Sequence, residues 1–129
     1  MAVDVRELLD RAREARRHAY APYSGYAVGA AVATGSGKIY TGANVENASS
    51  GLTVCAERVA ILKAVTGGDR DLVAVAVVTA DGATPCGACR QVLREFGAGI
   101  EIHLAGETGP ARRTDLATLL PEPFTLDPS

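Results

Sequence analysis

The sequence has no excess of positive charge and few aromatic side chains. Its 129 residues include 13 Lys and Arg against 15 Asp and Glu, for a formal net charge of −2, and only 5% are aromatic. Proteins that follow a nucleic-acid backbone need a broad positive surface, and those that bind single strands add aromatic stacking platforms. We therefore expect no nucleic-acid partner.

Long apolar runs are also absent. No segment approaches the roughly 20 apolar residues that a membrane-spanning helix needs. The opening residues, MAVDVRELLD, are charged from the fourth position and lack the apolar centre of a secretion signal. We expect a cytoplasmic protein without a membrane partner, folded as one domain over residues 1–129, because this length suits a single core.

Cysteine is scarce, with Cys55, Cys86 and Cys89 as the whole supply. An odd number of cysteines cannot pair completely, and structural disulfides are rare in a reducing compartment. The three cysteines therefore need an explanation other than disulfide bonding.

The apolar pattern predicts helices that alternate with strands. We expect helices over residues 4–19, 55–65, 86–96 and 115–120, and strands over 27–34, 38–44, 72–80 and 99–105. Gly35-Ser36-Gly37 joins the first two strands as a hairpin turn, because the full spacing of a phosphate loop is missing. The continuous apolar run 72–80 is typical of a central strand covered on both faces. This order predicts an α/β fold, a mixed sheet with helices on both faces.

All three cysteines lie at the starts of predicted helices. Cys55 opens one helix, and Cys86 and Cys89 open the next. Helix N-termini present unpaired N–H groups and the positive end of the helix dipole, which favour thiolates. Three thiolates on a tetrahedral zinc leave one position open, as a catalytic zinc requires.

These residues have other interpretations. A Cys-x-x-Cys at a helix start is also typical of thioredoxin-like redox proteins, and Cys55 would then be an ordinary buried cysteine. A structural zinc would need a fourth ligand, but His18 and His103 are not at ligand spacing from any cysteine. Glu57 is either a solvated helix residue or an acid beside the open metal position.

Nearly the whole chain resembles the cytidine deaminase family, in its small zinc-dependent form with three cysteine ligands, through YAPYSGYAVGAAV, TGANVENAS, CAER, PCGACRQVL and LLPEPF. The zinc deaminase signature is a His or Cys two residues before a Glu, followed by Pro-Cys-x-x-Cys. The resemblance implies a three-layer α/β/α fold with a mixed five-stranded sheet, assembled as a homotetramer.

The activity implied by the resemblance is hydrolytic deamination of cytidine and deoxycytidine to uridine and deoxyuridine plus ammonia, a step of pyrimidine salvage. Cys55, Cys86 and Cys89 would hold Zn²⁺, which activates a water for attack on C4 of the cytosine ring. Glu57 would carry the water's proton to N3 and later to the departing amine. A polynucleotide-editing deaminase shares this chemistry, but the slightly acidic chain disfavours it.

Substrate contacts are implied by the same resemblance. Asn44 and Glu46 would bind a ribose hydroxyl. The N–H of Ala56 and the carbonyl of Thr84 would hold the base and its leaving group. Phe124 would pack over the base from a neighbouring subunit.

Four further positions bear on the chemistry. Three thiolates weaken the Lewis acidity of zinc, and Arg58 or Arg90, each directly after a motif, could hydrogen-bond the sulfurs. The resemblance favours Arg58. Tyr26 stands where the family commonly has Phe, so it keeps the stacking ring and adds a hydroxyl. Ser50 stands where many relatives have a Tyr that lines the site between subunits, which leaves open a related activity on a modified cytosine nucleoside.

Overall fold

A mixed sheet forms the middle layer of the protein. The computed structural model describes residues 3–126, so the outermost residues of the predicted 1–129 domain lie outside it. The five strands lie in the order β2-β1-β3-β4-β5. They are β1 (Gly29–Thr34), β2 (Ile39–Ala43), β3 (Leu72–Val78), β4 (Glu101–Ala105) and β5 (Arg112–Asp115). Only the β3–β4 pair is parallel, which confirms the predicted mixed sheet.

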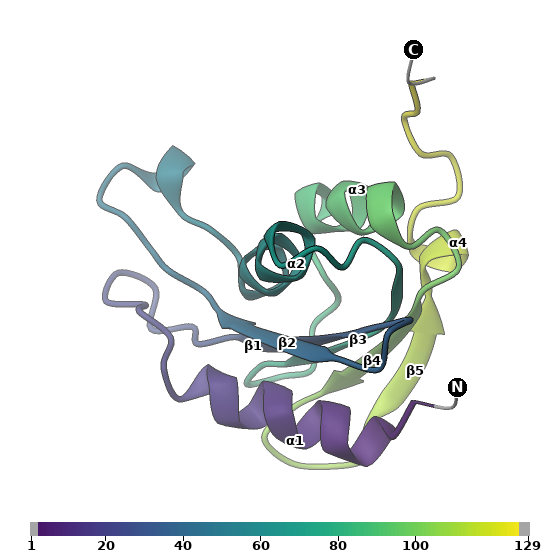
Figure 1. The fold of residues 1–129 in the computed structure, drawn as a ribbon. Coiled ribbons are helices and arrows are strands. Elements are labelled where there is room, and N and C mark those ends of the chain that lie inside the picture. Colours follow the sequence, from purple (N-terminus) through teal and green to yellow (C-terminus); the bar gives the residue numbers. More distant parts are fainter. Residues whose placement is uncertain (1–2, 127–129) are drawn as a thin grey trace.

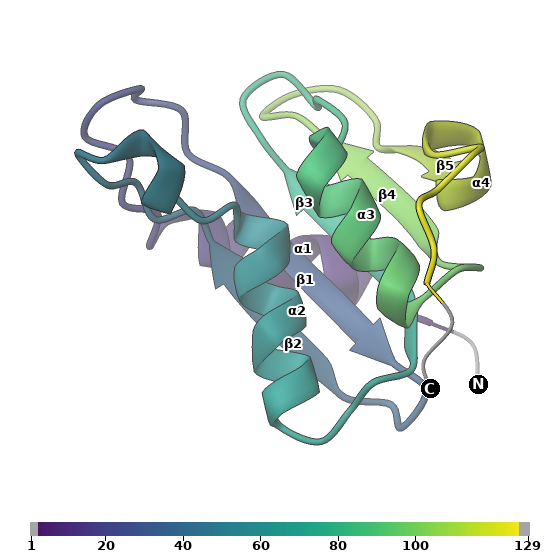
Figure 2. The ribbon, with the colours of Figure 1, turned by 90° about the horizontal axis from the view of Figure 1, so that it is seen from above.

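Helices cover both faces of this sheet. They are α1 (Val5–Arg16), α2 (Ala56–Thr66), α3 (Gly87–Phe96) and the short α4 (Leu116–Leu119), with a 3₁₀ turn η1 (Ser50–Leu52) before α2. Helix α1 lies on one face, and α2 and α3 lie on the other (Figure 1), side by side when seen from above (Figure 2). Within residues 3–126, no helix combines the length and the apolar character needed to cross a bilayer. Because helices cover both faces of the sheet, the predicted three-layer α/β/α arrangement is confirmed.

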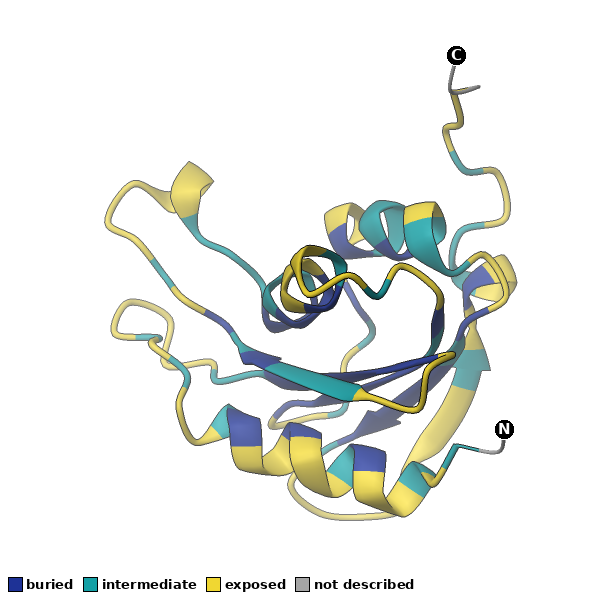
Figure 3. Cartoon of the chain, in the orientation of Figure 1, coloured by how far each residue is buried: buried dark blue, intermediate teal, exposed yellow. Residues whose placement is uncertain are grey.

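The central position of strand β3 explains why its sequence is continuously apolar. It lies between β1 and β4 at the centre of the sheet, and six of its seven residues are buried. Val75 and Val77 belong to the core under α2 and α3, whereas Ala74, Ala76 and Val78 belong to the core over α1. Both faces of the strand are thus covered, as Figure 3 shows by its dark blue colour.

Strand β5 is the element that the apolar pattern did not predict. Its sequence is RRTD, and three of its four residues are exposed at the edge of the sheet. An edge strand needs no apolar alternation, and charged residues there discourage pairing with other chains. The helix predicted over 115–120 begins only at Leu116, because Asp115 serves as its cap and accepts a hydrogen bond from the Thr118 N–H at 2.8 Å.

Helix α2 approaches the sheet closely at Gly42 of β2. A Cβ atom added to Gly42 would lie 2.6 Å from the Ala56 carbonyl oxygen and 2.6 Å from the Ala60 nitrogen. Only a residue without a side chain therefore lets the first turn of α2 rest directly on the strand. This contact fixes the height of the helix N-terminus, where Cys55 and Glu57 lie.

Candidate active site

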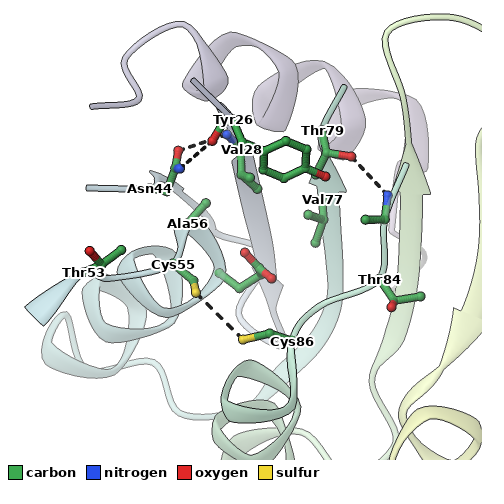
Figure 4. Close-up of a pocket in the computed structure, with 12 residues that line it drawn as sticks. Tyr26, Val28, Asn44, Thr53, Cys55, Ala56, Val77, Thr79, Thr84 and Cys86 are labelled. Atoms are coloured by element: carbon green, nitrogen blue, oxygen red, sulfur yellow. Dashed lines mark hydrogen bonds between the residues drawn. The ribbon is translucent and has the colours of Figure 1, made fainter. Parts of the chain in front are cut away.

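The three cysteines meet where α2 and α3 begin. Cys55 is the N-cap of α2, Cys86 is the N-cap of α3, and Cys89 lies in the first turn of α3. The Cys55 and Cys86 sulfurs are 3.8 Å apart (Figure 4), and those of Cys86 and Cys89 are 3.5 Å apart. These separations are far longer than the disulfide bond of about 2.05 Å, so all three are free thiols.

The sulfur triangle fits a zinc ion. Tetrahedral coordination with Zn–S bonds of about 2.3 Å places the sulfurs about 3.8 Å from one another. The three sulfurs all lie within 4.8 Å of one another, and no further His, Cys, Asp or Glu ligand atom joins them among the described residues. His103 is buried on β4 beside Glu101, and His18 borders a different groove. The donor set is thus three sulfurs, which leaves one tetrahedral position open.

The electrostatics of the cysteines also suit a cation. The pKa of the Cys55 thiol is lowered to about 5, first by a hydrogen bond from Cys89 and then by one from Arg58. The pKa of Cys89 is raised, because its thiol donates to Cys55 and is buried. One thiolate therefore forms readily while a second is held back. A divalent cation would favour deprotonation of all three, because it replaces repulsion between thiolates by attraction.

The structure shows which of the two arginines, Arg58 or Arg90, lies beside the cysteine sulfurs. The Arg58 Nη2 atom lies 3.6 Å from the Cys55 sulfur and donates to the Thr53 carbonyl at 3.3 Å. Arg90 instead donates to the Pro85 carbonyl at 2.8 Å, the Thr84 hydroxyl at 3.0 Å and the Leu119 carbonyl at 2.9 Å. Arg58 is thus the arginine beside the sulfurs, and Arg90 braces the loop before Cys86.

Beside the cysteines lies a cavity of about 210 Å³ (Figure 4). Its wall consists of Tyr26, Val28, Asn44, Thr53, Cys55, Ala56, Glu57, Val77, Thr79, Ala83, Thr84 and Cys86. A largely apolar wall with a few directed polar groups is typical of a small-molecule site. Seven of the residues predicted from the sequence are therefore gathered around one cavity.

Glu57 is a buried acid in this wall. It lies in the first turn of α2 and is only 4% exposed. Burial is the main cause that raises its pKa, and the neighbouring charge of Cys55 raises it further. A carboxyl group with a raised pKa can both accept and return a proton near neutral pH.

Asn44 shapes the cavity through its side-chain amide. Its Oδ1 atom accepts from the Val28 N–H at 2.9 Å, and its Nδ2 atom donates to the Tyr26 carbonyl at 2.8 Å. The amide therefore holds the segment that leads into β1. One hydrogen of the Asn44 amide group remains beyond these two contacts.

Two of the predicted substrate-binding residues, Glu46 and Phe124, are not part of the cavity wall. The Glu46 carboxylate accepts from the N–H groups of Tyr23, at 2.9 Å, and Ser24, at 3.2 Å, and from the Ser24 hydroxyl. The Ser24 hydroxyl is the main cause that lowers the Glu46 pKa. Phe124 is 69% exposed in the segment after α4, where its carbonyl accepts from Gln91 at 2.8 Å. Ser50 is exposed in η1.

The sequence reasoning missed Thr79 and Asp81, which follow the central strand. The Tyr26 hydroxyl donates to Asp81 at 2.6 Å, and the Thr79 hydroxyl accepts from the N–H groups of Gly82 and Ala83 at 2.7 and 3.1 Å. Their signal was available, because polar residues at the carboxyl end of a central strand are placed to line a site.

Comparison with known proteins agrees with this geometry. Residues 3–103 match the family described as "Cytidine and deoxycytidylate deaminase zinc-binding region". The chain is 44% identical to the cytidine deaminase of Sporosarcina psychrophila, over 97% of this chain and 94% of that protein. It is 45% identical to that of Halalkalibacterium halodurans, over 97% of both chains. The crystal structure of cytidine deaminase from Burkholderia pseudomallei is similar with a TM-score of 0.90 and 45% identity, covering 95% of this chain and 100% of that one.

Proposed function

The chain belongs to the cytidine and deoxycytidylate deaminase family, and from this premise we propose that it is a zinc-dependent deaminase of cytidine and deoxycytidine. The products would be uridine or deoxyuridine and ammonia, as in pyrimidine salvage. The observation that carries the proposal is the buried Glu57 in the wall of a cavity that also contains two of three clustered cysteines.

The metal would be held by Cys55, Cys86 and Cys89. Bound zinc acts as a Lewis acid and lowers the pKa of a water molecule toward about 7. Arg58 lies 3.6 Å from the Cys55 sulfur and would offset part of the negative charge of three thiolates. Three free thiols also suit the cytoplasm, where the reducing environment keeps cysteines unpaired.

Glu57 would move the protons of the reaction. Its burial favours the protonated acid and so brings its pKa closer to neutral pH. The carboxylate would accept a proton from the attacking water, give it to N3 of the base and then assist the departing amine. The same group serves each step because it lies within the cavity wall.

The base would be held by backbone groups at the two helix starts. The Ala56 N–H belongs to the first turn of α2, where N–H groups have no partner within the helix. Thr84 lies in the loop before α3, and Arg90 fixes this loop through the Thr84 hydroxyl and the Pro85 carbonyl. The Thr84 carbonyl would accept a hydrogen bond from the leaving amine.

The sugar would be held by Asn44 and Glu46. Asn44 retains one amide hydrogen beyond its two backbone contacts. Glu46 already accepts three hydrogen bonds, and an ionised carboxylate has about four acceptor positions, so one remains for a ribose hydroxyl. Such a site would disfavour free cytosine, because its polar groups would be left unpaired.

The function is tested by the substrate range of the purified protein. We expect kcat/KM to be high for cytidine and deoxycytidine and at least about 10³-fold lower for cytosine, which lacks the sugar. Cytidine monophosphate should also react poorly, because no Gly-rich loop or arginine cluster in the matched motifs would receive its phosphate. Metal analysis should find one zinc per chain, lost in Cys55→Ala, Cys86→Ala and Cys89→Ala. Equal activity on cytosine, or full zinc in all three variants, would contradict the proposal.

A further inference from the structure

The hydroxyl of Tyr26 is already occupied within the protein. Tyr26 lies in the segment before β1, and its phenol oxygen donates to the Asp81 carboxylate at 2.6 Å. Asp81 follows β3, 55 residues later in the chain. Figure 4 shows the Tyr26 ring across the top of the cavity, between Val28 and Thr79. The hydrogen bond thus connects two walls that come from distant parts of the sequence.

Asp81 is itself held in place. The Thr79 hydroxyl donates to the same Asp81 oxygen at 3.2 Å and accepts from the N–H groups of Gly82 and Ala83. These contacts order the loop that leads to Thr84. Asp81 is exposed and is not part of the cavity wall, whereas Tyr26 and Thr79 are. Any effect of Asp81 on a molecule in the cavity must therefore pass through Tyr26 or this loop.

We propose that Asp81 is a positioning residue, which holds the Tyr26 ring against the cavity before the nucleoside arrives. The inference rests on the proposed function. A phenol ring in an irregular, partly exposed segment would otherwise sample several rotamers, and binding would have to order it. A second consequence concerns specificity: because the Tyr26 hydroxyl is engaged by Asp81, the ring presents to the base the same apolar face as a Phe.

The chain offers a matched pair as a control. The Tyr40 hydroxyl donates to Asp69 at 2.5 Å, so it makes the same type of hydrogen bond. Neither Tyr40 nor Asp69 lies in the cavity wall. Loss of that bond would reveal what a purely structural Tyr–Asp contact does to the enzyme.

The test compares kcat and KM for cytidine in wild-type protein, Tyr26→Phe, Asp81→Ala, Asp81→Asn, the double variant Tyr26→Phe/Asp81→Ala, and Tyr40→Phe. We expect Tyr26→Phe and Asp81→Ala each to raise KM about threefold to tenfold, with kcat within twofold of wild type. The double variant should be no worse than the poorer single variant, because both remove one interaction. Asp81→Asn keeps an acceptor and should be intermediate, and Tyr40→Phe should change KM less than twofold.

The outcomes separate this inference from the function beneath it. If the wild-type protein turns over cytidine, two results would overturn the positioning role alone. One is an unchanged KM in Tyr26→Phe and Asp81→Ala, and the other is a KM in the double variant that equals the product of the two single effects. An equal rise of KM in Tyr40→Phe would also overturn it. If wild type does not turn over cytidine, the function fails, and calorimetric titration of the same variants with uridine decides the positioning role by the same pattern in Kd. Melting temperatures establish that each variant is folded, and absence of any nucleoside binding would end both proposals.

Discussion

Glu57 carries its carboxyl group in a nearly water-free position, with only 4% of the residue exposed. Burial without a basic partner is costly for a carboxylate, and a core position would normally hold an apolar residue. The pKa of Glu57 is raised by this burial. The residue is therefore expected to reduce the stability of the protein in exchange for the proton transfers that we propose for it.

Glu57→Gln tests both halves of this expectation. The amide cannot transfer protons, so kcat for cytidine should fall by about 10⁴-fold, the upper end for general acid–base catalysis, with zinc content unchanged. Because folding raises the Glu57 pKa, the stability of the metal-free protein falls as pH rises from the ordinary value through the raised one. The metal-free variant should thus melt at or above the wild-type temperature at pH 7. A variant within tenfold of wild-type kcat would exclude the proton shuttle.

Arg58→Gln tests the assignment of the arginine beside the sulfurs. The variant loses a donor 3.6 Å from the Cys55 sulfur, and we expect zinc affinity to weaken by about 10- to 100-fold in competition with a chelator. Arg90→Gln is the comparison, because Arg90 donates to Thr84, Pro85 and Leu119 and to no sulfur. Arg90→Gln should mainly lower the melting temperature and should weaken zinc binding less than Arg58→Gln does. Wild-type affinity in Arg58→Gln would remove Arg58 from this role.

Helix α2 is the element that brings most of the chemistry together. Its N-cap is Cys55, and its first turn carries Ala56, Glu57 and Arg58. The position of this turn depends on its contact with Gly42 of β2. A shift of the helix away from this contact would therefore move a proposed metal ligand, a proposed base contact and the proposed catalytic acid at once.

Gly42→Ala should show how strictly this height is set. The new methyl group would lie 2.6 Å from the Ala56 carbonyl oxygen, so the helix start must shift. We expect a loss of about 1–3 kcal/mol in the free energy of unfolding, measured in urea, together with lower kcat/KM. Gly99→Ala is the matched control, because nothing lies within 4 Å of a Cβ atom there. Equal unfolding midpoints for the two variants would contradict the close packing.

The cavity of the single chain has a smaller volume than a typical ligand site. The volume of about 210 Å³ compares with about 300–1,000 Å³ for typical pockets. At the same time Phe124 is 69% exposed, although burial of a Phe ring is strongly favourable. Both observations support the proposal that the site is completed by Phe124 of a neighbouring subunit in a homotetramer.

Three measurements test this assembly: KM of single variants, the mass of the protein in solution, and the activity of two mixed variants. Phe124→Ala should raise KM for cytidine about tenfold, while Leu126→Ala, an exposed apolar residue two positions later, changes it less than twofold. Light scattering should give the mass of four chains. Subunits of Glu57→Gln retain Phe124, so mixed tetramers with Phe124→Ala should regain a low KM at the intact sites. A fully active monomer, or mixed tetramers without recovery, would contradict the shared site.

The sequence by itself determined the local features of this protein. The order of helices and the first four strands was correct because each follows from apolar period and turn chemistry within a few residues. The central position of β3 followed from its continuous apolar run, and all three cysteines lie at helix starts as predicted, although only the packing of α2 beside α3 brings them together. Motif spacing pointed to Cys55, Cys86 and Cys89 as the proposed metal ligands, although only Cys86 and Cys89 are close neighbours along the chain.

Tertiary structure decided whatever depends on distant contacts. The charged strand β5 exists because it pairs with β4, since apart from Thr114 its own residues do not favour a strand. Arg58 and Arg90 each directly follow a cysteine motif, so the sequence does not distinguish them. Only the packing decides that Arg58 lies beside a sulfur and that Arg90 donates to carbonyls. The partner of the Tyr26 hydroxyl lies 55 residues away. Long side chains choose among many partners in space, and the sequence pattern describes only neighbours along the chain.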